Sequence, residues 1–214
     1  MSNRYRVSGA EGEFEPGSDG QVLRNLVGIN AAADMDEVEL ELLLQLYKEV
    51  LIHGLPERTL SVKDLKDWHR LWLGNVYTWA GQERSVNMGK GGFAFAAAAQ
   101  IPRLLSDFER NFLARWTPCD QLSHAELVEA IAVTHVEFIL IHPFREGNGR
   151  LSRLLADVMA VQARHAPLDY SEWERRKSDY IKAIHAGFAG NYDPMCAFVG
   201  EAMNAGDRNL SEPT

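Results

Sequence analysis

Apolar residues recur at helical spacing in the first half of the chain. Residues 34 to 52 predict a helix, which Gly54 and Pro56 end. The repeat consists of Leu40, Leu43, Leu44, Tyr47 and Leu51. Ser61 can cap a second helix. For the aromatic and histidine residues of that region we favour core packing over a ligand-binding wall: Trp68, His69, Trp72, Tyr77 and Trp79.

The most apolar helix is predicted in the middle of the second half. It follows a helix expected over residues 97 to 116, and Ser123-x-x-Glu126 forms a capping box that opens it. The segment from there to about Leu140 is apolar nearly all round, which is typical of a buried central helix. His135 lies on this helix, and we interpret it as a hydrogen-bonded core residue.

Three further helices are expected beyond this point. The first covers residues 151 to about 164, and Pro167 cannot prolong it. Ser171-x-x-Glu174 is a second capping box, from which we expect a helix to about Gly187. Asp193-Pro194 begins the last helix, because proline is tolerated at the first helical position.

Residues 83 to 96 interrupt the helical pattern. Residues 83 to 88 and 93 to 95 predict two short strands, and Gly89-Lys90-Gly91-Gly92 predicts the turn between them. A plain solvent loop is an equally good interpretation of the composition alone. A hairpin edge could, however, capture an extended segment of another chain. The predicted fold is therefore mainly α, a helical bundle around a central buried helix with a small β-hairpin flap.

Composition limits the domain count and the class of partner. The chain has 214 residues, of which 46% are hydrophobic, and this suits one domain over residues 34–206. Residues 1–33 are expected to form an N-terminal arm, and residues 207–214 a disordered tail. The formal charge of −8 argues against nucleic acid as a partner. The sequence shows neither a secretory signal nor a membrane span, so we expect a cytoplasmic protein without a membrane partner.

The stretch from His142 to Arg153 is built to hold phosphates. Pro143 disfavours helical geometry at His142, so the buried helix should end there. Gly147 and Gly149 allow close backbone approach to a ligand, and the next helix should begin near Asn148. The amides at such a helix N-terminus bind anions.

Side chains of the same stretch supply candidate catalytic groups. His142 has a reference pKa of roughly 6.5, which suits a general base for a hydroxyl nucleophile. Glu146 is a single carboxylate, and a single carboxylate beside ATP phosphates is the usual site of Mg²⁺. Arg150 and Arg153 lie three residues apart on one helix face and could bind one polyphosphate.

The run His142-x-Phe144-x-Glu146-Gly147-Asn148-Gly149-Arg150-x-x-Arg153 resembles the signature of Fic domains, which transfer AMP from ATP to protein hydroxyls. The resemblance extends over roughly residues 35 to 205. It implies roles for the residues of the run: His142 as base, Glu146 as magnesium ligand, Phe144 as core anchor, and Gly147, Asn148, Gly149, Arg150 and Arg153 as phosphate contacts.

The same resemblance implies roles outside the run. The hairpin is similar to the family's flap, which aligns the target protein by strand addition. It implies that Lys90 and Gly91 lie near the nucleotide and that Tyr180 and Ile181 pack on adenine.

One departure from the family concerns regulation. Fic enzymes are commonly restrained by Ser/Thr-x-x-x-Glu-Gly/Asn, and no serine or threonine here begins that motif. The resemblance then implies a toxin held by a small separate antitoxin that supplies the inhibitory helix. Toxins of this type often act on type II topoisomerase subunits. Two alternatives remain: a Doc-like protein phosphotransferase, and a catalytically silent Fic fold used for binding.

Overall fold

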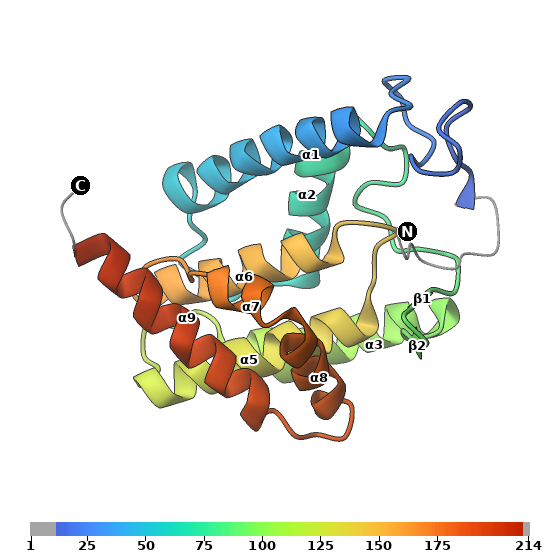
Figure 1. Ribbon diagram of the computed structural model, residues 1–214. Coiled ribbons are helices and arrows are strands. Elements are labelled where there is room, and N and C mark those ends of the chain that lie inside the picture. The colour runs from blue at the N-terminus through green and yellow to red at the C-terminus, as the bar shows by residue number, and fades with distance from the viewer. Residues whose placement is uncertain (1–11, 212–214) are drawn as a thin grey trace.

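Helices form nearly all the regular structure of residues 12 to 211, the part of the chain that the computed structural model describes (Figure 1). The helices are α1 (Ala32–Tyr47), α2 (Val62–Leu73), α3 (Ile101–Phe108), α4 (Ala114–Trp116), α5 (His124–Ile141), α6 (Asn148–Gln162), α7 (Ser171–Arg175), α8 (Lys177–Gly187) and α9 (Asp193–Ser211). Turns of π-helix at Lys48–His53 and Glu109–Leu113 extend α1 and α3, and a 3₁₀ turn at Ala98–Gln100 precedes α3. The described residues contain no helix that is both long and apolar enough to cross a membrane.

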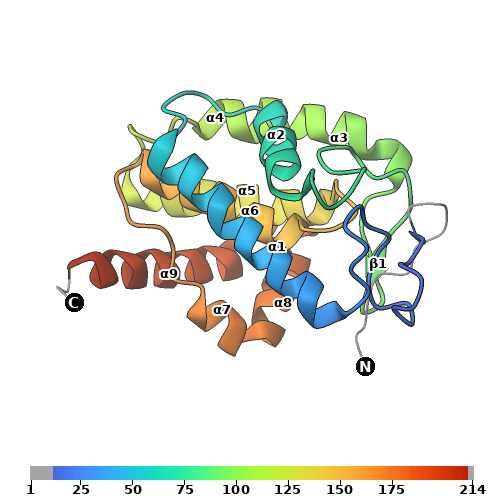
Figure 2. The same ribbon diagram turned by 90° about the horizontal axis from the view of Figure 1, so that it is seen from above.

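The predicted central helix is confirmed as α5. The side chain of Ser123 accepts a hydrogen bond from the amide of Glu126, whose carboxylate accepts the Ser123 amide in return. Eleven of its residues are buried, from Leu127 to Ile141. Figure 1 shows α6 alongside α5 and α9 crossing α5, and Figure 2 shows α5 and α6 together in the middle of the molecule. Because α5 has neighbours on several sides, its sequence is apolar nearly all round.

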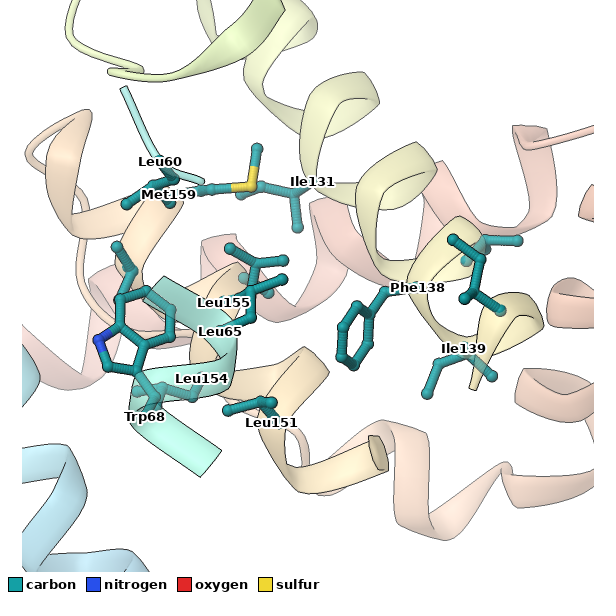
Figure 3. Packing of buried hydrophobic residues seen from close by; sticks show 14 of the residues in the cluster. Leu60, Leu65, Trp68, Ile131, Phe138, Ile139, Leu151, Leu154, Leu155 and Met159 are labelled. Carbon is teal, nitrogen blue, oxygen red and sulfur yellow. The ribbon is translucent and has the colours of Figure 1, made fainter. Parts of the chain in front are cut away.

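The core between α2, α5 and α6 fixes the position of the loop that joins α5 to α6. Figure 3 shows Leu65 and Trp68 of α2 facing leucines of α6, with Phe138 of α5 further along the same cluster. Trp72 and Leu73 are also almost fully buried. The expected core role of the aromatic residues on α2 is therefore confirmed, and Ser61 caps that helix as predicted.

The buried face of α1 differs from the one that the leucine repeat predicts. Leu40 and Leu44 are 55% and 56% exposed, whereas Met35, Glu39 and Leu46 are buried. Glu39 can be buried because its carboxylate accepts the Tyr77 hydroxyl at 2.7 Å and pairs with Arg150 at 2.8 Å. These partners compensate the buried charge, so Glu39 can lie on the buried face beside apolar residues. Leu43, Tyr47 and Leu51 of the predicted repeat are partly buried and pack against the core.

Two expectations for the C-terminal third are wrong. Ser171 is the first residue of α7 and its side chain does not cap the helix, whose N-cap is Tyr170. The expected single helix breaks at Arg176, where φ is −104° and ψ is 37°, although its predicted end at Gly187 is confirmed. The tail does not lose order at residue 207, since α9 continues to Ser211. Asp207 stabilises that end by accepting the Ala166 amide at 2.9 Å and pairing with His165 at 2.7 Å. The remainder of the expected tail, 212–214, lies outside the described residues, as do residues 1–11 of the arm.

The flap is a real hairpin but a shorter one than predicted. Strands β1 (Gly89–Lys90) and β2 (Phe93–Ala94) are antiparallel, with Lys90 opposite Phe93. The expected strand over residues 83–88 is absent because this segment binds elsewhere: the Arg84 amide, for example, donates to the carbonyl of Pro143 at 2.8 Å. Figure 1 shows the hairpin beside the C-terminal end of α5.

Candidate active site

His142 lies where α5 ends, as the sequence predicts. Its φ is 51°, which is left-handed and uncommon for a residue other than glycine, and its side chain is almost wholly buried. The Nδ1 atom lies 3.2 Å from the carbonyl of Ile139 and must be the donor in that bond, so the lone pair of the neutral ring is on Nε2. Phe95 from the flap stacks on the ring with centroids 3.7 Å apart.

The surroundings of His142 keep its ring neutral. Burial lowers its pKa to about 3, and the positive charges of Arg84 and Lys90 act in the same direction. A histidine that is neutral at pH 7 has a lone pair that can take a proton, which is one requirement for a general base. The other is a pKa near the working pH, and burial moves the His142 pKa away from it. The influence of Lys90 also means that the flap tip lies close enough for its charge to reach the site.

Gly147 and Asn148 shape the turn into α6. Gly147 has a φ of 79°, and a Cβ on it would lie 2.6 Å from the Trp72 ring. Asn148 is buried, and its side-chain amide accepts the Phe144 amide at 2.9 Å and donates to the Phe144 carbonyl at 2.8 Å. The Asn148 side chain therefore holds the loop, and what this residue offers a phosphate is its backbone amide. Phe144 is buried, which agrees with its expected role as an anchor.

His69 supports the same loop from α2. Its ring stacks on Phe144 with centroids 4.0 Å apart. The Nε2 atom donates to the Glu146 carbonyl at 3.1 Å, and Nδ1 accepts the Gly81 amide at 2.8 Å. Burial lowers the His69 pKa to about 4, so the neutral ring with these two bonds is the stable form. The expected structural role of His69 thus includes positioning the backbone of Glu146.

Glu146 and Arg150 form a charged cluster with Glu39. The Arg150 guanidinium lies 2.8 Å from Glu39, 3.9 Å from Glu146 and 4.5 Å from the centre of the Trp72 ring. Because the distance to Glu39 is the shorter one, the Arg150 guanidinium is paired mainly with Glu39. The Glu146 side chain is about one third exposed. Its carboxylate is consequently available to a cation, whereas Arg150 is held mainly by protein groups.

Arg153, one turn further along α6, is paired with Glu174 of α7 at 2.6 Å and lies 5.0 Å from the Tyr170 ring. The Glu174 side chain is 55% exposed, and pairs of this kind stabilise little. An anion with more charge could therefore displace Glu174 from Arg153.

The two residues expected to contact adenine lie on α8. The Tyr180 hydroxyl bonds to His135 Nε2 at 2.8 Å, and its ring stacks on Trp173 at 5.0 Å. Ile181 is 42% exposed. The Tyr180 ring is thus fixed by core residues, and Ile181 is the more accessible of the two. The hydrogen bond from Tyr180 also agrees with the expected core role of His135.

The flap lies against the loop at His142, where Phe95 stacks on the histidine ring. Lys90 and Gly91 lie at its exposed tip, and Gly91 has a φ of 59°. A pocket of about 280 Å³ lies between β2, the C-terminal end of α5 and Phe188, the residue after α8. Phe95 lines this pocket and also stacks on His142, so the pocket adjoins the histidine ring.

Sequence reasoning missed two residues of this region, Glu39 and Arg84. Glu39 gives no local signal because it is one of several acidic residues on α1, and its partner Arg150 is remote in the chain. Arg84 falls within the expected strand, yet its side chain is buried and bonded to the carbonyl of His142 at 2.6 Å.

Comparison with known proteins agrees with this geometry. The Fic/DOC family matches residues 59 to 160. A Sinorhizobium fredii protein named as a probable protein adenylyltransferase is 30% identical over 82% of this chain and 88% of its own length. The protein adenylyltransferase VbhT of Bartonella schoenbuchensis is 29% identical over 95% of this chain, which spans only 41% of that protein.

A solved structure shows the same fold. The Bartonella tribocorum protein BepC, crystallised with bound AMPPNP, superposes with a TM-score of 0.69 at 23% identity, over 84% of this chain and 91% of that one. The helical arrangement, the loop between α5 and α6, and the sequence matches lead to one conclusion. The chain belongs to the Fic/DOC family.

Proposed function

We propose that this chain is a protein adenylyltransferase, which transfers AMP from ATP to a Ser, Thr or Tyr hydroxyl of another protein. The observation that carries the proposal is the neutral His142, with its Nε2 lone pair, at the loop that leads into the N-terminus of α6. Nε2 takes the proton of the target hydroxyl as its oxygen attacks the α-phosphorus of ATP. The bond from that phosphorus to the β-phosphate oxygen breaks, and pyrophosphate leaves.

The first turn of α6 would hold the phosphates. Its amides at Asn148, Gly149 and Arg150 lack partners within the helix by geometry, and they point toward the loop. Arg153 would contact the distal phosphate after exchanging Glu174 for it. Lys90 and Gly91 of the flap would lie near the nucleotide, and Tyr180 and Ile181 would lie beside adenine.

Glu146 would hold Mg²⁺ with the nucleotide. Within residues 12 to 211, no three His, Cys, Asp or Glu side chains are grouped to hold a metal. A cation at Glu146 therefore needs phosphate oxygens as further ligands, which is the habit of Mg²⁺. When bound, Mg²⁺ supplies charge that offsets the negative charge of the phosphates.

The flap and the absence of the family's inhibitory motif from this sequence suggest two protein partners. A segment of the target would pair with the flap edge and present its hydroxyl to His142. The sequence contains no Ser/Thr-x-x-x-Glu-Gly/Asn motif, so we propose a small antitoxin that supplies an inhibitory helix. This makes the chain the toxin of the pair, acting in the cytoplasm, with type II topoisomerase subunits as the first targets to test.

Labelled ATP tests the reaction. The protein is incubated with Mg²⁺, a bacterial lysate or purified topoisomerase subunits, and ATP labelled at either the α or the γ phosphate. We expect α label on a protein with the wild type and none with His142→Ala. Transfer of γ label would instead identify a Doc-like phosphotransferase. Absence of both labels from every protein would leave only a binding role.

A further inference from the structure

Arg84 is a buried cation with an unusual set of acceptors. It is 3% exposed. Its Nε atom donates to the carbonyl of His142 at 2.6 Å, and Nη1 donates to that of Val86 at 2.5 Å. Nη2 donates to the carbonyls of Ala96 at 2.6 Å and Ile141 at 3.3 Å. A buried guanidinium with four backbone acceptors is well compensated for its lost hydration.

These acceptors belong to two different parts of the site. Val86 and Ala96 lie on the two sides of the hairpin, before β1 and after β2. Ile141 and His142 form the C-terminal end of α5, where carbonyls lack helical partners and where a positive charge is favourable. One side chain therefore joins both arms of the flap to the backbone of the catalytic histidine.

Two further contacts join the flap to the C-terminal end of α5. The Ala96 amide donates to the Leu140 carbonyl at 3.2 Å, and Phe95 stacks on the His142 ring. The arm after β2 thus runs along the end of α5 as far as the catalytic ring. If the Arg84 fork were lost, these contacts would still hold the arm after β2, and the bond from the Arg84 amide to the Pro143 carbonyl would still hold the arm before β1. No side chain would then bind both arms to the end of α5.

We infer that Arg84 is a positioning residue that sets the distance and angle between the flap and His142, and so places a flap-bound target hydroxyl against the base. The inference rests on the proposed function for its catalytic meaning. None of the four acceptors belongs to residues 146 to 153, which would hold the phosphates, and only the flap tip at Lys90 and Gly91 links the flap to the nucleotide. Arg84 should consequently affect use of the protein target far more than binding of ATP.

Arg84→Lys tests this, because lysine keeps the charge but cannot form the planar fork. The target is the protein that wild type labels with α-labelled ATP in the lysate. We expect kcat/KM for that protein to fall by about 10²-fold, the usual effect of a misplacement of about 1 Å. Binding of AMPPNP, measured by calorimetry, should weaken far less, because the phosphate site at the start of α6 does not involve Arg84. Arg103→Lys, at an exposed arginine of α3, is the matched control and should change neither quantity.

A second measurement does not depend on the reaction. Lys90 lies at the exposed flap tip, so trypsin can report how firmly the flap is held. Cleavage after Lys90 in native protein should be faster in Arg84→Lys, while the thermal unfolding midpoint identifies any general loss of stability. Unchanged cleavage after Lys90 would overturn the inference, as would an equal loss of target use and AMPPNP binding. If wild type transfers no label, the proposed function fails. The trypsin cleavage rates then test by themselves whether Arg84 holds the flap against α5.

Discussion

Gly147→Ala should destabilise the fold through two separate effects. Alanine in the left-handed region, where Gly147 has a φ of 79°, costs about 1 to 2 kcal/mol. The new Cβ would lie 2.6 Å from a Trp72 ring atom, and that ring is 1% exposed. Its indole N–H also donates to the Glu39 carbonyl at 2.9 Å, so the ring cannot move freely. Overpacking of this kind costs about 1 to 3 kcal/mol.

The sum is a loss of roughly 2 to 5 kcal/mol in the free energy of unfolding, which lowers the thermal midpoint by roughly 5 to 15 °C in a chain of this size. Calorimetry or circular dichroism during heating measures the change. Gly149→Ala is the matched control two residues away. Its Cβ meets nothing within 4 Å and its φ is not left-handed, so alanine should raise stability by about 0.5 kcal/mol.

Activity separates the two variants further. The Gly149 Cβ would enter the space where we place the phosphates, so Gly149→Ala should lose AMP transfer while keeping or gaining stability. A Gly147→Ala protein that unfolds at the wild-type temperature would refute the close approach to Trp72. A Gly149→Ala protein with full activity would refute the phosphate position.

Three other predictions concern ionisable and polar side chains. Burial lowers the pKa of three histidines to about 3 or 4: His69, His135 and His142. Below pH 6.5 the unfolded chain binds three protons that the folded chain does not, and Asp157, whose pKa is raised to about 7, offsets one of them. Near pH 5 the free energy of unfolding should therefore fall by about 3 kcal/mol for each unit by which the pH is lowered. Urea unfolding at several pH values measures this change, and a free energy that does not depend on pH would contradict it. Asn148→Ala should cost about 2 kcal/mol, because the Phe144 amide and carbonyl lose their partners, and an unchanged urea midpoint would argue against that role. Glu146→Gln should raise the Mg²⁺ concentration needed for AMP transfer, whereas an unaltered Mg²⁺ titration would remove Glu146 from the metal site.

Local signals explain which parts of the fold were predictable. The cap at Ser61, the capping box at Ser123 and the proline after His142 act within four residues, so the beginnings of α2 and α5 and the end of α5 follow from sequence. The second box at Ser171 shows the limit of such signals. The same residue pattern lies inside α7, since the Ser171 amide is instead taken by the Asp169 side chain at 2.9 Å.

The residues of the site were also predictable only where local sequence places them together. The run from His142 to Arg153 places a base, a carboxylate and a helix N-terminus in one loop, and consecutive residues must lie close together. Its side-chain partners come from remote segments. Arg84 and His142, which are hydrogen-bonded, are 58 positions apart in the chain. Glu39 of α1 forms an ion pair with the equally remote Arg150.

The amino-acid sequence by itself determined the helical class, the central helix and the loop from His142 to the start of α6, because each depends on periodicity or on neighbouring residues. Only the tertiary structure decided the buried face of α1, the order at the end of α9 and the attachment of the flap to α5. These depend on pairs of polar groups that folding brings together, and no local pattern records which remote carbonyl or carboxylate a buried charge will meet.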